Sequence, residues 1–203
     1  MYRISDPAGF DGKLKRLKRT GWVLRNVADP EPIAAHMYRM GIMAMCIEPQ
    51  PGFCMTKVLK MSLIHDLAES KVGDITPHCG VTSEEKHQRE VEAMGELVEL
   101  LPQEIGNEFM GLFEEYESGT SPEAKLVKDL DKFDMIVQAE DYESDRSCPS
   151  EHLQEFFEST RGKFTSGVVK EWVKALYQKR ASRISEEHSA EREGRTAASG
   201  KEA

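Results

Sequence analysis

The sequence has few aromatic residues and few cysteines. Its 203 residues include 7% aromatic side chains and four cysteines, Cys46, Cys54, Cys79 and Cys148. The cysteines show no CxxC spacing and no close-set cluster, so a zinc ribbon and a small disulfide scaffold are both unsupported. Reduced, mostly buried cysteines in a cytosolic or nuclear compartment are the simpler account.

Long apolar runs and an excess of positive charge are also missing. The longest apolar run, around residues 42–47, is far shorter than the about 20 residues that cross a bilayer. The segment MYRISDPAGF has no apolar core of the signal-peptide type. We therefore predict a soluble, intracellular protein, cytoplasmic or nuclear, without a membrane partner. The formal net charge of −9 argues against duplex nucleic acid as a partner, because cationic side chains supply most of that affinity.

One segment, residues 12–25, departs from this acidic balance. It contains six cationic residues: Lys13, Lys15, Arg16, Lys18, Arg19 and Arg25. Two interpretations stay open. The cations form a solvated helix face, or one or two of them attract an anionic small molecule.

Helical periodicity extends along most of the chain. No segment shows convincing two-residue alternation, so we predict no sheet. The apolar spacing predicts helices over residues 10–20, 32–47, 55–69, 83–101, 103–117, 122–142, 150–160 and 166–183. The sequence therefore predicts an all-α protein with a single compact domain over residues 1–183. Residues 184–203 have no apolar periodicity and are expected to form a disordered C-terminal tail.

The dipeptide His65-Asp66, within LKMSLIHDLAES, is the most informative feature of the chain. Adjacent side chains on a helix diverge by about 100°, yet both reach a point that lies over the edge between them. A divalent cation is such a point, because it binds an imidazole nitrogen and a carboxylate oxygen at once. His36 lies on the apolar face of residues 32–47. Asp131 lies on the most apolar helix, where an unpaired carboxylate would cost several kcal/mol.

Taken together, His36, His65, Asp66 and Asp131 predict one mixed nitrogen and oxygen metal site. A lone histidine on an apolar face is more often a hydrogen-bonded core residue, but four such residues on three helical segments favour a metal. Mn²⁺, Co²⁺, Mg²⁺, Fe²⁺ and Zn²⁺ suit these ligands. The order His … His-Asp … Asp is the pattern that gives the HD superfamily of metal-dependent phosphohydrolases its name.

Two further acids are candidates for catalysis. Glu69 is four residues after His65 and shares its face, and Asp74 lies in the following loop, KVGDITP. The plainer interpretations are a surface helix acid and a turn residue. Beside a metal, a carboxylate can orient the attacking water or accept its proton. The pair can instead hold a second ion, with the backbone carbonyl of Ile75 as a possible helper.

Three segments, RTGWVLRNVADPEPIAAHMYRM, LIHDLAESKVGDITP and KLVKDLDKFDM, resemble the HD-domain 5′-deoxynucleotidases, most closely the eukaryotic HD domain-containing protein 2 branch. The resemblance covers roughly residues 9–183. It implies an all-α HD-domain helical bundle, a homodimer, and metal-dependent removal of phosphate from deoxyribonucleoside 5′-monophosphates. It also implies residue roles: His36, His65, Asp66 and Asp131 as metal ligands, and Glu69 and Asp74, with Ile75 beside them, as catalytic acids or second-ion ligands.

The same resemblance suggests substrate contacts. Trp22 matches an aromatic residue near the sugar, where an indole can pack on deoxyribose and leave no room for a 2′-hydroxyl. The plainer interpretation is a half-buried tryptophan that closes the first helix. The bacterial branch places an arginine directly before this tryptophan, and this chain has Gly21. Arg19, Arg25 or Lys71 can supply the phosphate-binding cation instead, and the sequence does not choose among them.

Other functions compatible with the same pattern are another HD-type nucleotide phosphohydrolase or phosphodiesterase, and a non-catalytic nucleotide-sensing scaffold. Guanosine-tetraphosphate hydrolases usually carry an extra acid at the position of Ser70. Di-metal HD enzymes would be expected to supply more histidines, and the remaining four, His78, His87, His152 and His188, show no ligand spacing. The intact ligand set, with Glu69 and Asp74, favours an enzyme over a scaffold.

Overall fold

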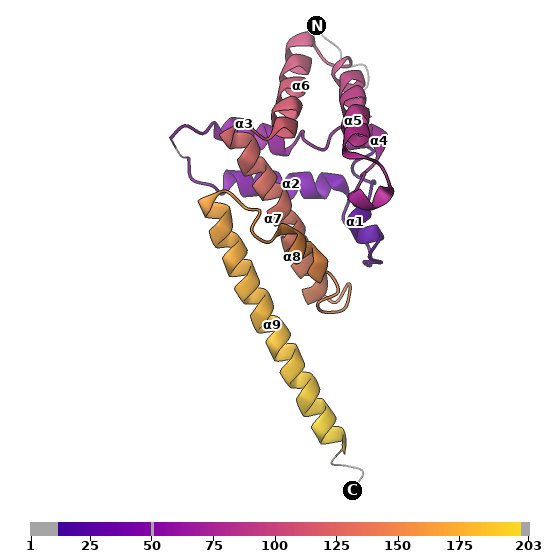
Figure 1. The fold of residues 1–203 in the computed structure, drawn as a ribbon, viewed down its shortest axis with the longest axis vertical. Helices are drawn as coiled ribbons and strands as arrows, with labels where there is room; N and C mark the ends of the chain where they lie inside the picture. The colour runs from indigo at the N-terminus through magenta and orange to yellow at the C-terminus, as the bar shows by residue number, and fades with distance from the viewer. Residues whose placement is uncertain (1–11, 50, 200–203) are drawn as a thin grey trace.

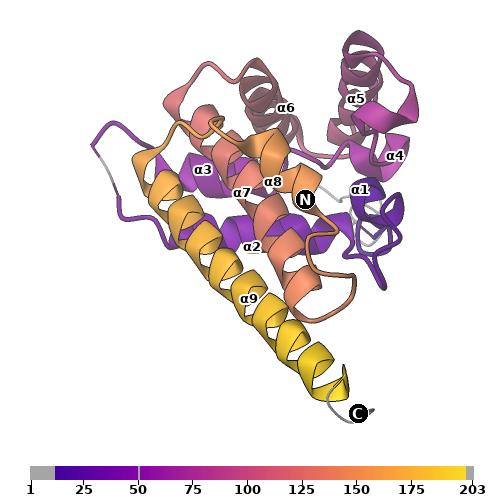
Figure 2. The ribbon, with the colours of Figure 1, turned by 60° about the horizontal axis from the view of Figure 1, so that its bottom comes forward.

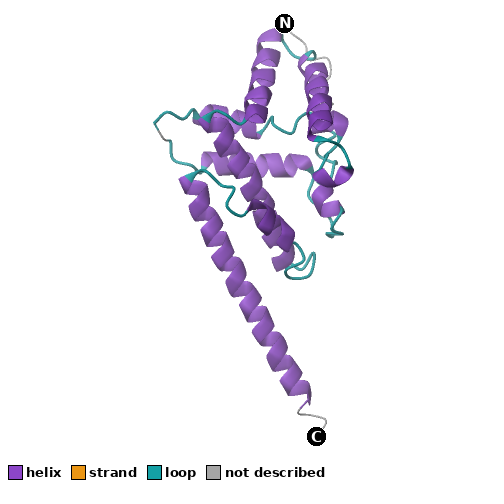
Figure 3. Ribbon diagram, viewed as in Figure 1, coloured by secondary structure: helices purple, strands orange, loops and turns teal. Residues whose placement is uncertain are grey.

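The computed structural model describes residues 12–49 and 51–199 of the chain. All regular structure in these two ranges is helical (Figure 3), apart from an isolated β-bridge between Lys18 and Pro32. In chain order the elements are α1 (Thr20–Val23), α2 (Ile33–Met45), α3 (Met55–Ser62), α4 (Glu69–Val72), the 3₁₀ helix η1 (Pro77–Cys79), α5 (Ser83–Val98), α6 (Gln103–Ser118), α7 (Pro122–Ser144), α8 (Gln154–Thr160) and α9 (Gly167–Ser199). The prediction of an all-α protein is confirmed.

Helix α7 is the central element of the fold. It packs against α2, α3, α6, α8 and α9, and Figures 1 and 2 show α2 and α3 crossing it while α9 runs along the outside. Its side chains at Leu130, Ile136 and Ala139 are fully buried. A helix that is apolar nearly all round belongs in such a position, as its sequence predicted. The helix begins where expected, because the Ser121 hydroxyl accepts a hydrogen bond from the Ala124 amide at 3.1 Å.

The segment before α2 differs from the predicted helix over residues 10–20. Residues 10 and 11 lie outside the described residues, and residues 12–19 form turns and the bridge, so that α1 covers only Thr20–Val23. The Arg19 amide donates to the Glu31 carbonyl at 3.0 Å, and the Ile33 amide donates to the Leu17 carbonyl at 2.9 Å. These tertiary hydrogen bonds replace the helical ones that the local periodicity would favour.

The predicted helix over residues 55–69 is interrupted. Helix α3 ends at Ser62, and residues 63–68 form successive turns before α4 begins at Glu69. The Ile64 amide donates to Met61 at 3.1 Å, and the Leu67 amide donates to Ile64 at 2.9 Å. These three-residue spacings are tighter than those of an α-helix. The His65-Asp66 dipeptide therefore lies in a tight turn between two helices.

The chain beyond residue 183 also differs from the expected disordered tail. Helix α9 continues to Ser199, and Figure 1 shows its last part projecting past the helical body. Arg183 donates to Glu140 and to Glu143, at 2.8 and 3.0 Å, and to Glu187 one turn further along at 3.0 Å. Charged pairs thus stabilise a region where apolar periodicity is missing. Residues 200–203 lie outside the described residues.

The four cysteines agree with one expectation and differ from another. All four cysteines are free, but only Cys148 is buried, so the expectation that most would be buried is wrong. Cys46, Cys54 and Cys79 lie on loops or helix ends, where thiols meet solvent.

Among the described residues, none of the helices combines the length and the hydropathy of a membrane span.

Candidate metal centre

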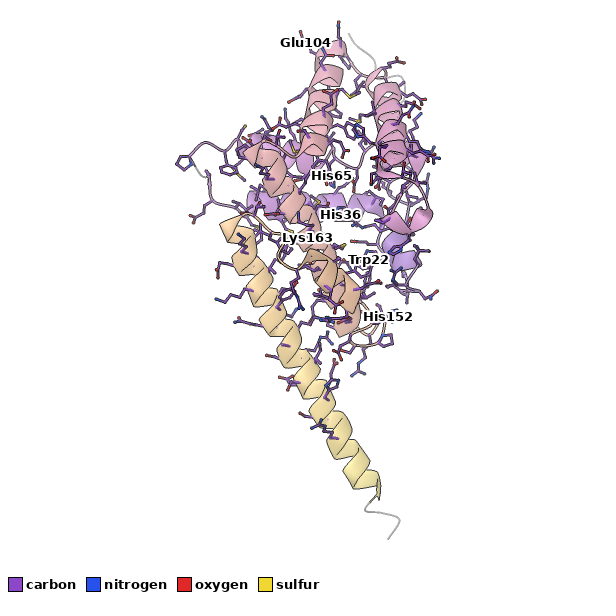
Figure 4. The ribbon with its side chains drawn as sticks, viewed as in Figure 1. Trp22, His36, His65, Glu104, His152 and Lys163 are labelled. Carbon is purple, nitrogen blue, oxygen red and sulfur yellow. The ribbon has the colours of Figure 1, made fainter. Side chains whose placement is uncertain are left out.

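Four side chains from α2, the turn at residues 63–68 and α7 converge on one point. The Nε2 atom of His36 lies 3.4 Å from Oδ1 of Asp131 and 3.6 Å from Oδ2 of Asp66. The Nε2 atom of His65 lies 3.2 Å from the same Asp66 oxygen. The two imidazole centroids are 5.6 Å apart, and Figure 4 shows both labelled histidines in the middle of the helical body. The predicted group is therefore brought together by the fold.

Hydrogen bonds at the far nitrogens orient both histidines. Nδ1 of His65 donates to the Ser62 carbonyl at 3.1 Å, and Nδ1 of His36 lies 2.7 Å from Oδ2 of Asp134. Both Nε2 atoms are buried and have no hydrogen-bond partner among the residues that the structure describes. Buried polar atoms are rarely left unpaired, and a metal ion would satisfy both.

Asp134 connects His36 to a cation behind the site. The side chain is fully buried, and Nε of Arg39 donates to its second oxygen, while Nη2 of Arg39 donates to its backbone carbonyl at 3.3 Å. Burial alone would raise the pKa of Asp134, but the hydrogen bonds from His36 and Arg39 lower it below its usual value. The carboxylate therefore stays ionised and holds the His36 ring in place.

The pKa values of His36, Asp66 and Asp131 reflect the charge that these converging groups share. Burial and Arg19 lower the pKa of His36, but the carboxylates of Asp131 and Asp134 outweigh them and raise it to about 9. Burial would raise the pKa of Asp66, but His65 lowers it to about 2. The pKa of Asp131 is also lowered, by His36, against the effect of burial. A cation that binds Nε2 of His36 therefore displaces a proton from it.

Glu69 and Asp74 lie beside these four residues. Glu69 is 4% exposed, and its Oε2 atom has no hydrogen-bond partner in the described part of the chain. Burial, with the charges of Asp66 and Asp74, raises the pKa of Glu69 well above its usual value. Asp74 is fixed by Thr20, whose amide donates to Oδ2 at 2.6 Å and whose hydroxyl donates to the Asp74 carbonyl at 2.8 Å. The loop thus folds back over the site, as the sequence suggested.

Glu69 and Asp74, together with His65, Asp66 and Asp131, line a cavity of about 320 Å³, which we call the catalytic cavity. Ile75 contributes to its wall. The charged groups around it are six carboxylates, Asp66, Glu69, Asp74, Glu90, Glu117 and Asp131, and three cations, Arg19, Lys86 and Lys128. Among these described groups the negative charge is in excess, which suits a bound metal cation more than an anion alone.

A second cavity of about 280 Å³, which we call the adjoining cavity, lies directly beside the first. The two cavities share four lining residues, Arg19, Asp74, Thr76 and Pro77. Small-molecule sites usually have volumes of about 300–1,000 Å³, so each cavity alone is small. Together they suit a molecule with one anionic end and one less polar end.

The structure places the candidate substrate residues in different positions relative to the two cavities. Trp22 lines the adjoining cavity but is only 1% exposed, and its indole nitrogen donates to Glu31 at 3.2 Å. It is thus more deeply buried than either interpretation of the sequence supposed. Arg19 lines both cavities, and Arg25 lines the adjoining one. Lys71 is not among the described residues that line either cavity, and it pairs with Glu96 at 3.2 Å.

Sequence reasoning missed several residues of the catalytic cavity, among them Tyr116, Lys128 and Lys86. The Tyr116 hydroxyl donates to Asp131 at 3.1 Å, and its ring lies 4.8 Å from that of His65. Lys128 lies 4.5 Å from the centre of the Tyr116 ring, and its place three residues before Asp131 on one helix was a usable signal. Tyr116 and Lys86 come from other helices, and no local spacing relates them to the ligands.

Comparison with known proteins gives the family. The HD domain model matches residues 12–172. The human protein "5′-deoxynucleotidase HDDC2" is 45% identical over 182 residues, which cover 88% of each chain, and its relative from Danio rerio is 47% identical over 173 residues, 85% of this chain and 86% of that one. A solved structure from Pyrococcus horikoshii OT3 is 29% identical, with a TM-score of 0.68 over 87% of this chain and 97% of that one. The chain therefore belongs to the HD-domain family and, within it, to the 5′-deoxynucleotidase HDDC2 group.

Proposed function

We propose that this protein is a metal-dependent 5′-deoxynucleotidase, which hydrolyses deoxyribonucleoside 5′-monophosphates to a deoxynucleoside and phosphate. The observation that carries the proposal is the convergence of two histidines and two aspartates beside a pair of cavities that share a wall. The named activity of relatives that are 45–47% identical supports the same reaction. Reduced cysteines are consistent with action in the cytoplasm or nucleus.

His36, His65, Asp66 and Asp131 would hold the metal ion. Two unpaired imidazole nitrogens and two ionised carboxylates fit a divalent cation such as Mn²⁺, Co²⁺ or Mg²⁺, and Fe²⁺ or Zn²⁺ also suits them. When bound, a divalent ion makes water a better nucleophile and offsets charge on a phosphoryl oxygen. In the alternative in which two ions bind, the Glu69 and Asp74 carboxylates, with the Ile75 carbonyl, would instead be the ligands of the second ion.

Glu69 is the general base of this proposal. Glu69 lines the catalytic cavity, and its Oε2 atom has no hydrogen-bond partner among the described residues, so this carboxylate oxygen is available to accept a proton. Asp74, which Thr20 holds in place, also lines the catalytic cavity and would orient the attacking water. As the new phosphorus–oxygen bond forms, Glu69 would accept the proton that the water loses, and the 5′-oxygen of the nucleoside would take up a proton as its bond to phosphorus breaks.

Arg19 is the phosphate-binding cation that best replaces the arginine missing at Gly21. It stands on the wall between the two cavities. Burial would lower the pKa of Arg19, but Asp131 and Asp66 raise it above its usual value, so the guanidinium stays charged. Lys86 and Lys128 also line the catalytic cavity. Trp22 closes the adjoining cavity on the sugar side, where a rigid indole would leave no room for a 2′-hydroxyl.

The protein is also proposed to act as a homodimer. Tyr38, Ile42 and Met45 project from one face of α2 at helical spacing, with exposures of 67%, 43% and 69%. Leu63, 45% exposed, packs against the same helix at Gly41. A contiguous exposed apolar stripe of this kind is typical of a protein–protein interface.

A substrate panel tests the proposed activity. Purified protein is incubated with deoxyribonucleoside and ribonucleoside 5′-monophosphates, cyclic nucleotides and guanosine tetraphosphate, each with Mn²⁺, Co²⁺, Mg²⁺ or EDTA, and the products, released phosphate among them, are separated and measured by chromatography. Release from the deoxyribonucleoside monophosphates, abolished by EDTA, is the expected result. Turnover of cyclic nucleotides or guanosine tetraphosphate instead would support another HD hydrolase, and binding without turnover would support a sensor.

A further inference from the structure

One end of the adjoining cavity is not used by the reaction proposed above. The four lining residues shared with the catalytic cavity mark the end nearest the phosphate. Arg25, His78, Glu155 and Phe156 line the adjoining cavity only. A mononucleotide that places its phosphate in the catalytic cavity and its sugar beside the shared wall therefore directs its base toward these four side chains.

Phe156 offers an aromatic surface at this end. It is half-buried on α8, and its ring centroid lies 4.5 Å from that of Trp22, which holds the ring from behind. Gly21 lies against the ring edge, where an added Cβ would stand 3.5 Å from Cε1, so the absence of a side chain at Gly21 leaves this edge of the ring clear. An aromatic ring that lines a cavity is a sequence-tolerant platform for a nucleobase.

Arg25 and Glu155 supply polar atoms next to that ring. Nη2 of Arg25 donates to Oε2 of Glu155 at 2.9 Å, Nε of Arg25 also donates to Oε1, and the guanidinium lies 5.8 Å from the centre of the Phe156 ring. The hydrogen bond from Arg25 lowers the pKa of Glu155. Nε2 of His78 lies 3.3 Å from Nη2 of Arg25, and His152 donates to the Arg25 carbonyl at 2.7 Å.

An ionised carboxylate accepts hydrogen bonds and cannot donate them. Adenine, cytosine and guanine each carry an exocyclic amino group that can donate to such an acceptor, and thymine carries none. Thymine can donate only through its ring N3–H, and the two carbonyl oxygens that flank this group would meet the negative charge of Glu155. The polar end of the cavity therefore discriminates among bases, while the ring of Phe156 does not.

We propose that this end of the adjoining cavity is the base-binding subsite of the nucleotidase. Phe156 is its stacking platform, and Glu155, held by Arg25, accepts a hydrogen bond from the amino group of the base. The preferred substrates are accordingly deoxynucleotides of adenine, cytosine and guanine rather than thymidylate. This inference rests on the proposed function, because it takes the catalytic cavity as the phosphate site.

The role of Phe156 is tested by comparing a nucleotide with a sugar phosphate that has no base. The values of kcat/KM for deoxycytidine 5′-monophosphate and for 2-deoxyribose 5-phosphate are measured for the wild type, Phe156→Leu and Phe156→Tyr. We expect Phe156→Leu to reduce the preference for the nucleotide about tenfold, since a leucine offers no aromatic face. Phe156→Tyr should retain the preference. Where the sugar phosphate turns over too slowly, the inhibition constants of the sugar phosphate and of deoxycytidine are measured instead. The ratio of these two constants reports the contribution of the base in each variant.

A matched control is Phe53→Leu, because Phe53 is half-buried and lines neither cavity. It should leave the preference unchanged. Because the preference is a ratio measured on one preparation, partial unfolding of a variant does not alter it. An unchanged ratio in Phe156→Leu, or the same decrease in Phe53→Leu, would overturn the stacking role.

The role of Glu155 is tested with Glu155→Ala, and with Glu158→Ala one turn along the same helix as its control. The wild type should favour deoxycytidine 5′-monophosphate over thymidine 5′-monophosphate by a factor on the order of five, and Glu155→Ala should bring that ratio close to one. Equal ratios in the wild type and Glu155→Ala would overturn the proposed acceptor. A wild type that releases no phosphate from any deoxynucleotide would instead contradict the proposed function itself.

Discussion

Two hydrogen bonds decide which nitrogen of each histidine faces the metal centre. His65 is oriented by the carbonyl of Ser62, three residues earlier, and His36 by Asp134 on a distant helix. The first partner is a consequence of the tight turn after α3. The second lies on α7, three residues after Asp131, so one helix carries both a ligand and the group that orients another.

Asp134→Asn should weaken metal binding about 10–100-fold, because an amide orients the His36 ring less firmly than a carboxylate and can present its NH₂ group to Nδ1. Titration with Mn²⁺ measures the dissociation constant directly. Asp141→Asn is the matched control, since Asp141 also contacts Arg39, at 3.2 Å, and does not touch a histidine. Equal affinity in the two variants would contradict the orienting role of Asp134.

Glu69→Gln should reduce kcat about 10²–10⁴-fold, because glutamine cannot accept the proton of the attacking water. The metal content should stay the same, since the four predicted ligands are intact. Elemental analysis of the purified variant, together with phosphate release, separates the two effects. Full turnover in Glu69→Gln, or loss of the ion, would show that the assigned role is wrong.

The sequence predicted the site residues to different degrees. His36, His65, Asp66 and Asp131 combine residue type, order and placement on apolar segments, and these signals can be read locally. Tyr116 could not be predicted, because only the packing of α6 against α7 brings its hydroxyl to Asp131. Lys86 likewise reaches the cavity through the packing of α5 against α4. The positions of such residues depend on the tertiary fold, and no periodic pattern in the sequence indicates them.

At the scale of elements, the start of α9 depends on one buried side chain. Oδ2 of Asp129, on α7, accepts hydrogen bonds from the amides of Thr165 and Ser166 at 2.6 and 2.7 Å, and from the Thr165 hydroxyl at 3.0 Å. These are donors at the N-terminus of α9, which otherwise lack helical partners. Asp129 therefore fastens the outer helix to the central one.

Asp129→Ala should lower the free energy of unfolding by about 2 kcal/mol, because two partly buried amides lose a charged acceptor. Urea denaturation followed by circular dichroism measures the change. Asp29→Asn is the control, since Asp29 is 95% exposed in its ion pair with Lys18 and asparagine tolerates its positive φ, so the substitution should matter little. Activity per folded molecule should be retained in both variants, and a stability equal to that of the wild type would contradict the capping role.

Element boundaries were predicted well where local signals dominate and poorly where tertiary contacts do. Ser121 and Pro122 start α7 as expected, because capping is a local interaction. The helix predicted from residue 55 ends at Ser62. The turn at residues 63–68 follows it and brings His65 and Asp66 to one point. The segment before α1 follows its hydrogen bonds with residues 31–33 rather than its own periodicity.

At the scale of the whole molecule, the exposed stripe on α2 should determine the oligomeric state. Met45→Glu and Ile42→Glu should convert the proposed dimer to a monomer, because each places a charge in an apolar contact. Light scattering coupled to size-exclusion chromatography measures the mass. Val91→Glu is a control, since Val91 is 37% exposed on α5, away from this stripe. A wild-type protein that is monomeric would contradict the proposal.

The two cavities give an acidic protein a place for an anionic substrate. The chain carries a formal charge of −9, yet Arg19, Lys86 and Lys128 are gathered where a phosphate would bind. These three cations, with the metal ion that the carboxylates would hold, offset the negative charge that a phosphate would otherwise meet in this cavity. Long-range repulsion from the remaining surface disfavours other binding modes.

The protein itself, rather than a bound ion, sets the direction of both imidazole rings. A preparation stripped by a chelator should therefore keep its shape, and activity should return as soon as a suitable ion is supplied, without any refolding. The metal-free enzyme is therefore an inactive, folded form that regains activity when the concentration of a suitable metal ion rises.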